Sequence, residues 1–184
     1  MRLSTGLVGI VILTSANAAR AADKPASRVD HMVALAKFDG EWRVQGQWAN
    51  GEKLDARTVY EWGLGKRILK AHTFVKNGRT EYQRYESIMA WHPRKNCLYE
   101  ISFTFNGDIS EHVIDVVDAE TLHIDFTPPE RDAGPPTKPG GPNVRQVLKF
   151  IDADHMTWTV TMNEGGEWKQ LIHATWVRQQ AHPQ

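Results

Sequence analysis

The sequence predicts an all-β protein, an antiparallel up-and-down β-barrel of about ten strands with a short N-terminal helix. The first observation is a recurring turn signal, the Asn-Gly pair, in which both residues tolerate the positive φ that a tight hairpin needs. The second is that the segments between this and other turn signals are each of strand length. The third is a period of two within several segments, with apolar and polar residues alternating. The Asn-Gly pairs are Asn50-Gly51, Asn77-Gly78 and Asn106-Gly107.

The first 21 residues have the features of a secretory signal peptide. Arg2 precedes the apolar run 7–13, and two Ala-x-Ala sites follow, at 16–18 and 19–21. The run is too short to span a bilayer, so we expect no stable membrane insertion. A buried N-terminal helix is the alternative. We therefore expect a signal peptide at 1–21, a barrel domain at 28–178 and a periplasmic or secreted location.

Length and charge exclude several classes of protein. A chain of 184 residues is long enough for one domain and one core. Removal of Arg2 and Arg20 with the signal peptide would change the formal net charge from 0 to −2. No run of positive charge marks a nucleic-acid surface. Cys97 is the only cysteine, so no intrachain disulfide can form and the core alone must stabilise the fold. Nothing in the sequence fixes the oligomeric state.

The predicted elements follow one another along the whole domain. Ser27 and Asp30 predict a helix N-terminus, and a helical face follows at Val29, Met32, Val33 and Ala36. The segment 127–143 is too rich in proline and glycine for a strand, so we expect a long loop that acts as a lid. The predicted strands are 41–49, 54–62, 67–76, 81–91, 97–105, 109–117, 121–127, 144–151, 155–163 and 167–178.

Short connections without a parallel crossover favour a closed barrel, because closure removes the sheet edges. A two-sheet sandwich is the alternative. In a barrel the first and last strands are neighbours. Trp42 and Trp48 share the apolar face of the first strand, and Trp176 and Arg178 share one face of the last. We therefore expect Arg178 to lie across the indole of Trp42 near one end of the barrel.

These features resemble the calycin superfamily, the lipocalin-like barrels, which share an N-terminal helix, a Gly-x-Trp on the first strand and a closing arginine on the last. Here the shared positions are Gly40, Trp42 and Arg178. The chain looks like a family of secreted bacterial lipocalin-like proteins of unknown function, matched through "FDGEWRV", "YEWGLGKRIL", "YESIMAWHPRK" and "ATWVR". It departs from true lipocalins in having about ten strands and no Thr-Asp-Tyr motif, so lipocalin ligands cannot be transferred to it.

Seven tryptophans favour an aromatic pocket for a flat or apolar molecule, with a barrel filled by its own side chains as the alternative. The strand 81–91 would bring polar groups inward on either face. Arg84 and Glu86 could then form a buried pair that orients a polar ligand end, and a partly solvated strand or a bulge is the alternative. The apolar candidates on the presumed inward face are Trp48, Tyr60, Trp62, Phe103, Phe105, Trp158 and Met162.

We therefore expect a non-catalytic protein that binds a small hydrophobic molecule, without a cofactor. A haem protein of the nitrobindin type, with His173 as axial ligand, is one alternative. An enzyme acting on a small lipid-like or polyketide-like substrate, with Arg84 and Glu86 in the cavity, is another, and a structural envelope protein with a filled barrel is a third. No His-Glu-x-x-His or His-x-His spacing indicates a metal site, and no pair of carboxylates stands out as an acid–base couple.

Overall fold

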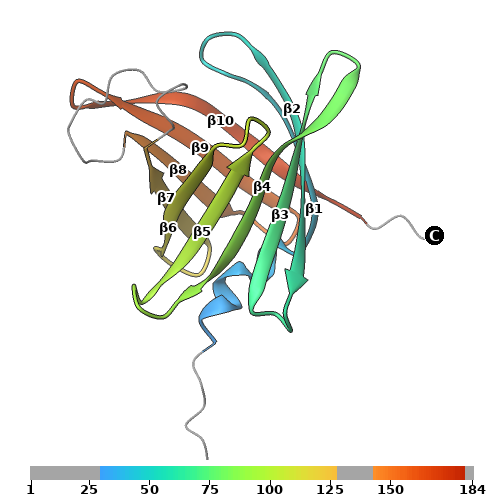
Figure 1. Ribbon diagram of the computed structural model, residues 1–184. Coiled ribbons are helices and arrows are strands. Elements are labelled where there is room, and N and C mark those ends of the chain that lie inside the picture. Colours follow the sequence, from blue (N-terminus) through green and yellow to red (C-terminus); the bar gives the residue numbers. More distant parts are fainter. Residues whose placement is uncertain (1–29, 128–142, 181–184) are drawn as a thin grey trace, which may run out of the picture.

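A computed structural model describes residues 30–127 and 143–180, which form one closed antiparallel barrel (Figure 1). Every strand pairs with its neighbours in the chain, and the first strand pairs with the last, so the predicted up-and-down barrel is confirmed. Each observed strand boundary lies within two residues of the predicted one. The strands are β1 (Gly40–Gln47), β2 (Lys53–Gly63), β3 (Ile68–Asn77), β4 (Thr80–His92), β5 (Cys97–Thr104), β6 (Ile109–Val116), β7 (Thr121–Phe126), β8 (Val144–Phe150), β9 (His155–Glu164) and β10 (Glu167–Gln179).

Several predictions concern residues outside the described ranges. These are the signal peptide at 1–21, the Ser27 part of the helix cap, and the lid formed by 127–143, of which only the two end residues are described. They stay predictions.

The helix before β1 differs in kind from the expected one. It is a 3-10 helix, η1 (His31–Phe38), and the Asp30 carboxylate caps it by accepting a hydrogen bond from the Met32 amide at 3.0 Å. A 3-10 helix has three residues per turn, so its buried face consists of Met32, Leu35 and Phe38. The predicted face assumed a period of 3.6 and is therefore wrong at Val33, which is 68% exposed, and at Ala36, which is also exposed.

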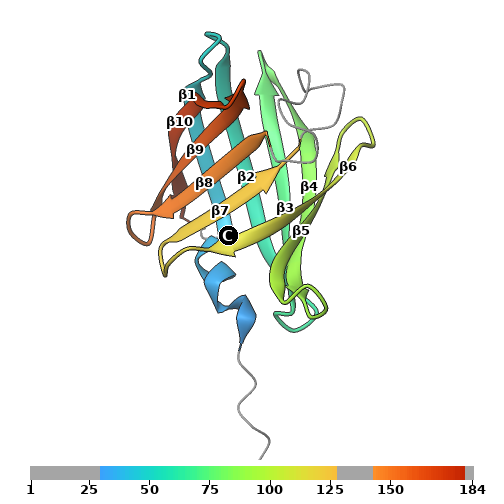
Figure 2. The same ribbon diagram turned by 90° about the vertical axis from the view of Figure 1, so that its left-hand side faces the viewer.

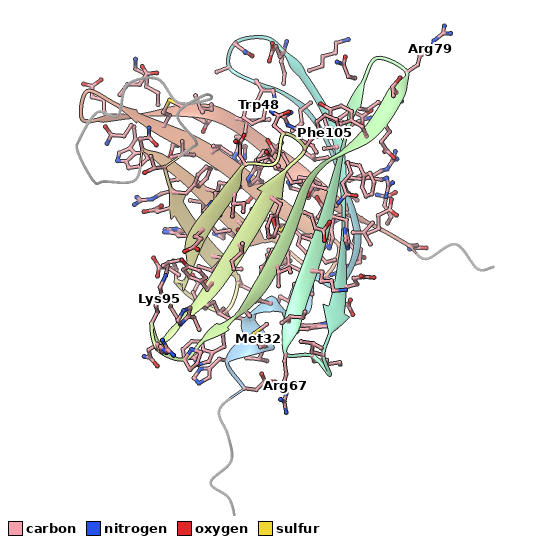
Figure 3. All side chains as sticks on the ribbon, in the orientation of Figure 1. Met32, Trp48, Arg67, Arg79, Lys95 and Phe105 are labelled. Carbon is pink, nitrogen blue, oxygen red and sulfur yellow. The ribbon has the colours of Figure 1, made fainter. Side chains whose placement is uncertain are left out.

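The helix closes one end of the barrel. Figures 1 and 2 show η1 at the end opposite the β1–β2 and β3–β4 hairpins. The Phe38 ring lies inside this end, 5.0 Å from the Tyr60 ring and 4.9 Å from the Phe150 ring. Figure 3 places Met32 at the helix end, and Trp48 and Phe105 at the other. A pocket of about 340 Å³ lies beside η1 at the helix end, lined by residues that include His31, Trp91 and Leu98.

The barrel interior has two unlike walls. The wall built from β7–β10 and β1 is mostly apolar, with buried side chains such as Ile124, Leu148 and Trp42, and Gln146 is a polar residue on its inner face. The wall built from β2–β6 carries buried hydroxyls and ionisable groups among its apolar residues. These polar residues are Thr58, Ser87, Ser102 and His112, all buried, and Glu100, whose side chain is 12% exposed.

Strand β5 presents to the barrel interior the face opposite to the predicted one, which carried Phe103 and Phe105. Leu98 and Ser102 are buried on its inner face, whereas Phe103 is 38% exposed and Phe105, in the following turn, is 68% exposed. The expectation that Phe103 and Phe105 face inward is wrong. A period of two separates two faces but does not say which one lies inside. The pairing with β4 determines which face of β5 lies inside. Ser102 is opposite the buried Ser87, and their hydroxyls form a hydrogen bond of 2.9 Å.

Candidate ligand-binding site in the barrel

The closing pair holds the helix end of the barrel together. Trp42 and Arg178 are register partners on β1 and β10, and the guanidinium carbon lies 4.3 Å from the indole centroid, as predicted. Trp42 is fully buried and donates from Nε1 to the Phe38 carbonyl at 2.7 Å. Arg178 donates to the carbonyl oxygens of Lys37, Asp39 and Ala153, which ties η1 and the β8–β9 turn to β10.

Gly40 leaves room for the contact between Arg178 and Trp42. Its φ is +110°, and a Cβ added there would lie 3.2 Å from Nη1 of Arg178. A side chain at this position would be strained and would press on the guanidinium. The Gly-x-Trp element and the closing arginine therefore form one structural unit that leaves the opposite end of the barrel free for binding.

Inward-facing side chains at that opposite end keep part of their surface accessible. Trp48, Phe126, Trp158 and Met162 pack against the core but are only half-buried. Tyr85 lies on the inner face of β4, opposite Thr73, and is 38% exposed. We call the five residues Trp48, Tyr85, Phe126, Trp158 and Met162 the mouth. The Trp48 and Trp158 rings meet edge to face at 5.8 Å. The mouth thus offers aromatic surface to a molecule entering from solvent.

A pocket of about 280 Å³ adjoins the mouth at β4 and β5. The β3–β4 register shifts between Thr73 and Phe74, which leaves Arg84 in a bulge of β4. The pocket brings together Arg84, Glu86, Phe103 and Phe105, four of the predicted site residues. However, Glu86 pairs with His72 and Phe103 on the outer face and is exposed. The predicted buried pair of Arg84 and Glu86 is therefore wrong.

Tyr60 and Trp62 do face inward, but towards the helix end. Tyr60 contacts Phe38, and Trp62 is the register partner of the buried Leu69. Of the nine predicted site residues, Trp48, Trp158 and Met162 belong to the mouth. Of the remaining six, Arg84, Glu86, Phe103 and Phe105 line the pocket at β4 and β5. Tyr60 and Trp62 lie towards the helix end.

A buried hydrogen-bonded couple lies below the mouth on the polar wall. Glu100 of β5 and His112 of β6 are register partners, and a Glu100 carboxylate oxygen lies 3.1 Å from His112 Nδ1. Their side chains are only 12% and 8% exposed. His112 Nε2 is buried and has no hydrogen-bond partner among the described residues. A buried polar atom without a partner costs about 1–3 kcal/mol, so this nitrogen calls for an explanation.

Tyr60 shares the interior with this couple. Burial of its phenol, and secondly the negative charge of Glu100, raise the pKa of Tyr60 well above its ordinary value. The folded protein therefore keeps the phenol neutral, whereas the unfolded chain ionises above about pH 10. The stability contributed by the neutral phenol is present below pH 10 and is lost as the pH rises towards the folded-state pKa.

We expect Tyr60→Phe to flatten the alkaline loss of stability. Urea unfolding at pH 8 and pH 11 should show a smaller decline in the free energy of unfolding for this variant than for the wild type, because Phe cannot ionise. Tyr82→Phe, near the tip of the β3–β4 hairpin, serves as the control and should decline like the wild type. A Tyr60→Phe decline equal to that of the wild type would show that the phenol is not titrating from a buried position.

His173 lies on the outer face of β10, between the buried Ile172 and Ala174. Its Nδ1 is 2.7 Å from the Thr159 hydroxyl, a register partner on β9. The bulge in β10, between Gln170 and Ile172, comes before it and does not turn it inward. An axial ligand for a haem inside the barrel cannot be supplied from this position.

Two further features of the described chain bear on the site. Within residues 30–127 and 143–180, no three His, Cys, Asp or Glu side chains are grouped closely enough to hold a metal ion. In the same ranges, no helix has the length and hydrophobicity needed to cross a lipid bilayer.

Comparisons with known proteins show the fold. No family model and no curated protein sequence matches the chain. The crystal structure of Rv2717c from M. tuberculosis is 14% identical, covers 82% of this chain and 98% of that chain, and has a TM-score of 0.51. A redesigned beta barrel, b11L5F_LGL, is 11% identical, with coverages of 80% and 96% and a TM-score of 0.41. EF1p2_mFAP2b bound to DFHBI is 14% identical, with coverages of 81% and 99% and a TM-score of 0.41. The likeness to Rv2717c is a likeness of fold.

Proposed function

We propose that this barrel binds a small, flat, largely apolar molecule in its mouth and does not transform it. The observation that carries the proposal is the mouth itself, where inward-facing aromatic side chains stay half-buried. A barrel filled by its own side chains would bury such rings, since protein interiors pack as densely as organic crystals. Concave surfaces lined by aromatic side chains are typical of ligand sites.

We further propose that the protein is a lipocalin-like barrel of the periplasm or the extracellular space. This rests on the signal-peptide features of residues 1–21 and on the resemblance at Gly40, Trp42 and Arg178. The haem and enzyme alternatives are not proposed, because they require His173 and Glu86 inside the barrel and both lie on the outer face.

Trp158→Ala should weaken binding of the apolar dye N-phenyl-1-naphthylamine about tenfold, because stacking surface at the mouth is lost. Dye fluorescence titrated with protein gives the dissociation constant. Trp168→Ala is the matched control: Trp168 lies in the same β9–β10 hairpin, pairs with Asn163 on the outer face and is 40% exposed. It should bind the dye like the wild type. Equal affinities in the two variants would place the dye outside the mouth and remove the proposal.

A further inference from the structure

The hydrogen bond between Glu100 and His112 determines which nitrogen of the buried imidazole carries the proton. Because a Glu100 carboxylate oxygen lies 3.1 Å from Nδ1, that ring nitrogen carries the proton and donates it in the hydrogen bond. In a neutral imidazole the other nitrogen, Nε2, then presents a lone pair and accepts hydrogen bonds. The His112 side chain is 92% buried, being 8% exposed, and Nε2 has no partner among the described residues. The interior therefore contains an unused acceptor held in a fixed orientation.

The surroundings of His112 connect it to the mouth. The Phe126 ring packs against the imidazole with the ring centroids 4.7 Å apart. Phe126 is the last residue of β7, belongs to the mouth and is only half-buried. The Phe126 ring therefore contacts the imidazole and also forms part of the accessible mouth.

The neighbouring polar groups do not compete for Nε2. The hydroxyls of Ser87 and Ser102 bond to each other at 2.9 Å, and those of Thr58 and Thr73 do the same at 2.9 Å. The opposite wall, from β7 through β10 to β1, is mostly apolar, and the Gln146 amide oxygen on it already accepts a hydrogen bond from Trp158 Nε1 at 2.7 Å. A ligand that fills the mouth would thus meet mainly apolar and aromatic surface on one side and the Nε2 atom of His112 on the other; Asn143 Oδ1 and Trp176 Nε1 are the other buried polar atoms without a partner among the described residues.

We propose that His112 Nε2 accepts a hydrogen bond from the ligand, so that the ligand is a flat apolar molecule with one hydroxyl or N–H donor. The inference rests on the proposed function and names the ligand class of the same site. Glu100 acts as a positioning residue that fixes the tautomer, and the Phe126 ring moves aside when the donor binds.

The test compares two probes that differ only in the donor. 2-Naphthol has a hydroxyl, and 2-methoxynaphthalene has the same ring system with the donor methylated. Both are titrated at pH 7 by quenching of the tryptophan fluorescence. The wild type should bind 2-naphthol about five- to tenfold more tightly, the size expected for one buried hydrogen bond to an otherwise unpaired acceptor.

The variants remove the acceptor while keeping the fold. Glu100→Met/His112→Phe replaces the couple by apolar side chains of similar size, so that no buried charge is left unpaired. It should bind both probes equally and keep the wild-type affinity for 2-methoxynaphthalene. Glu100→Gln keeps an acceptor for Nδ1–H but removes the charge, and should reduce the preference without abolishing it. His123→Phe, on β7 between the buried Leu122 and Ile124, is the control and should keep the full preference.

The outcomes separate the two proposals. If the wild type binds both probes equally, or if the double variant keeps the preference, binding in the mouth stands and the His112 anchor is wrong. If the wild type binds neither probe, both proposals fail. A preference lost in the double variant, reduced in Glu100→Gln and kept in His123→Phe supports the anchor, and it excludes a buried water molecule as the sole partner of Nε2.

Discussion

Trp42→Ala should lower the free energy of unfolding by about 3–5 kcal/mol, the cost of a large cavity in a packed core. Trp42 has no accessible surface, packs edge to face on Phe150 at 5.9 Å and donates a hydrogen bond to the Phe38 carbonyl. The substitution thus removes a central ring and leaves a buried carbonyl unpaired, at the point where η1, β1 and β10 meet. Urea unfolding followed by far-UV circular dichroism measures the loss.

Two further variants show whether the loss comes from this junction. Arg178→Ala should cost about 1–2 kcal/mol, because it removes the stacked guanidinium and its hydrogen bonds to carbonyl oxygens but leaves the core filled. Trp168→Ala, on the outer face, should cost no more than about 1 kcal/mol, because it loses only the contact with the Arg145 guanidinium, 4.9 Å from the ring centroid. Negligible losses in both Trp42→Ala and Arg178→Ala would mean that β1 and β10 do not close the barrel as described.

His112→Phe alone should cost about 3–5 kcal/mol, because it leaves the Glu100 carboxylate buried without its partner. The Glu100 side chain is 12% exposed, so water cannot replace the lost hydrogen bond. The same unfolding measurement gives the value. The loss arises from the unpaired charge, not from the missing imidazole.

Glu100→Met/His112→Phe tests that cause directly. Because neither partner remains, the double variant should lie within about 1.5 kcal/mol of the wild type, and thus be more stable than His112→Phe. If the double variant were as unstable as the single one, the loss would be due to poor packing of Phe at position 112, and the buried couple would not be the reason.

Much of the architecture could be predicted from local signals. Asn50-Gly51 and Asn106-Gly107 lie in turns between consecutive strands, and Asn77-Gly78 spans the end of β3 and the turn that follows it. Only the glycine of each pair has a positive φ, and the alternation between the pairs marked the strands to within two residues. The closing contact of Trp42 with Arg178 could also be predicted, because closure makes the first and last strands neighbours. The strand boundaries depend only on backbone geometry, and the closing contact depends on that geometry and on the favourable stacking of arginine on tryptophan.

The candidate site was only partly predictable, because alternation does not tell which face of a strand is inside. On β5 the aromatic Phe103 faces out and Glu100 faces in. On β4 the bulge at Arg84 shifts the register, and no residue type in this segment predicts a bulge. Burial of a carboxylate on a strand becomes favourable only because a partner on the next strand satisfies it.

A signal for that partner was nevertheless present. Glu100 and His112 each lie six residues from Asn106, and the β5–β6 register is centred on Asn106 alone, so the two residues are directly opposite each other. A carboxylate and an imidazole opposite each other on paired strands stabilise one another. Testing each hairpin for opposed ionisable pairs finds this couple only when the turn is centred on Asn106, because a two-residue Asn106-Gly107 turn would pair Glu100 with Val113.

Native mass spectrometry of the protein purified from its own host tests the central claim most directly. If the barrel binds a small apolar molecule in its mouth, the spectrum should contain a second species heavier by the mass of one small molecule. The same preparation of Trp158→Ala should have lost this species, and that of Trp168→Ala should have kept it. A bare polypeptide mass for the wild type, from a preparation that also fails to bind N-phenyl-1-naphthylamine, would contradict the claim and leave a filled, structural barrel.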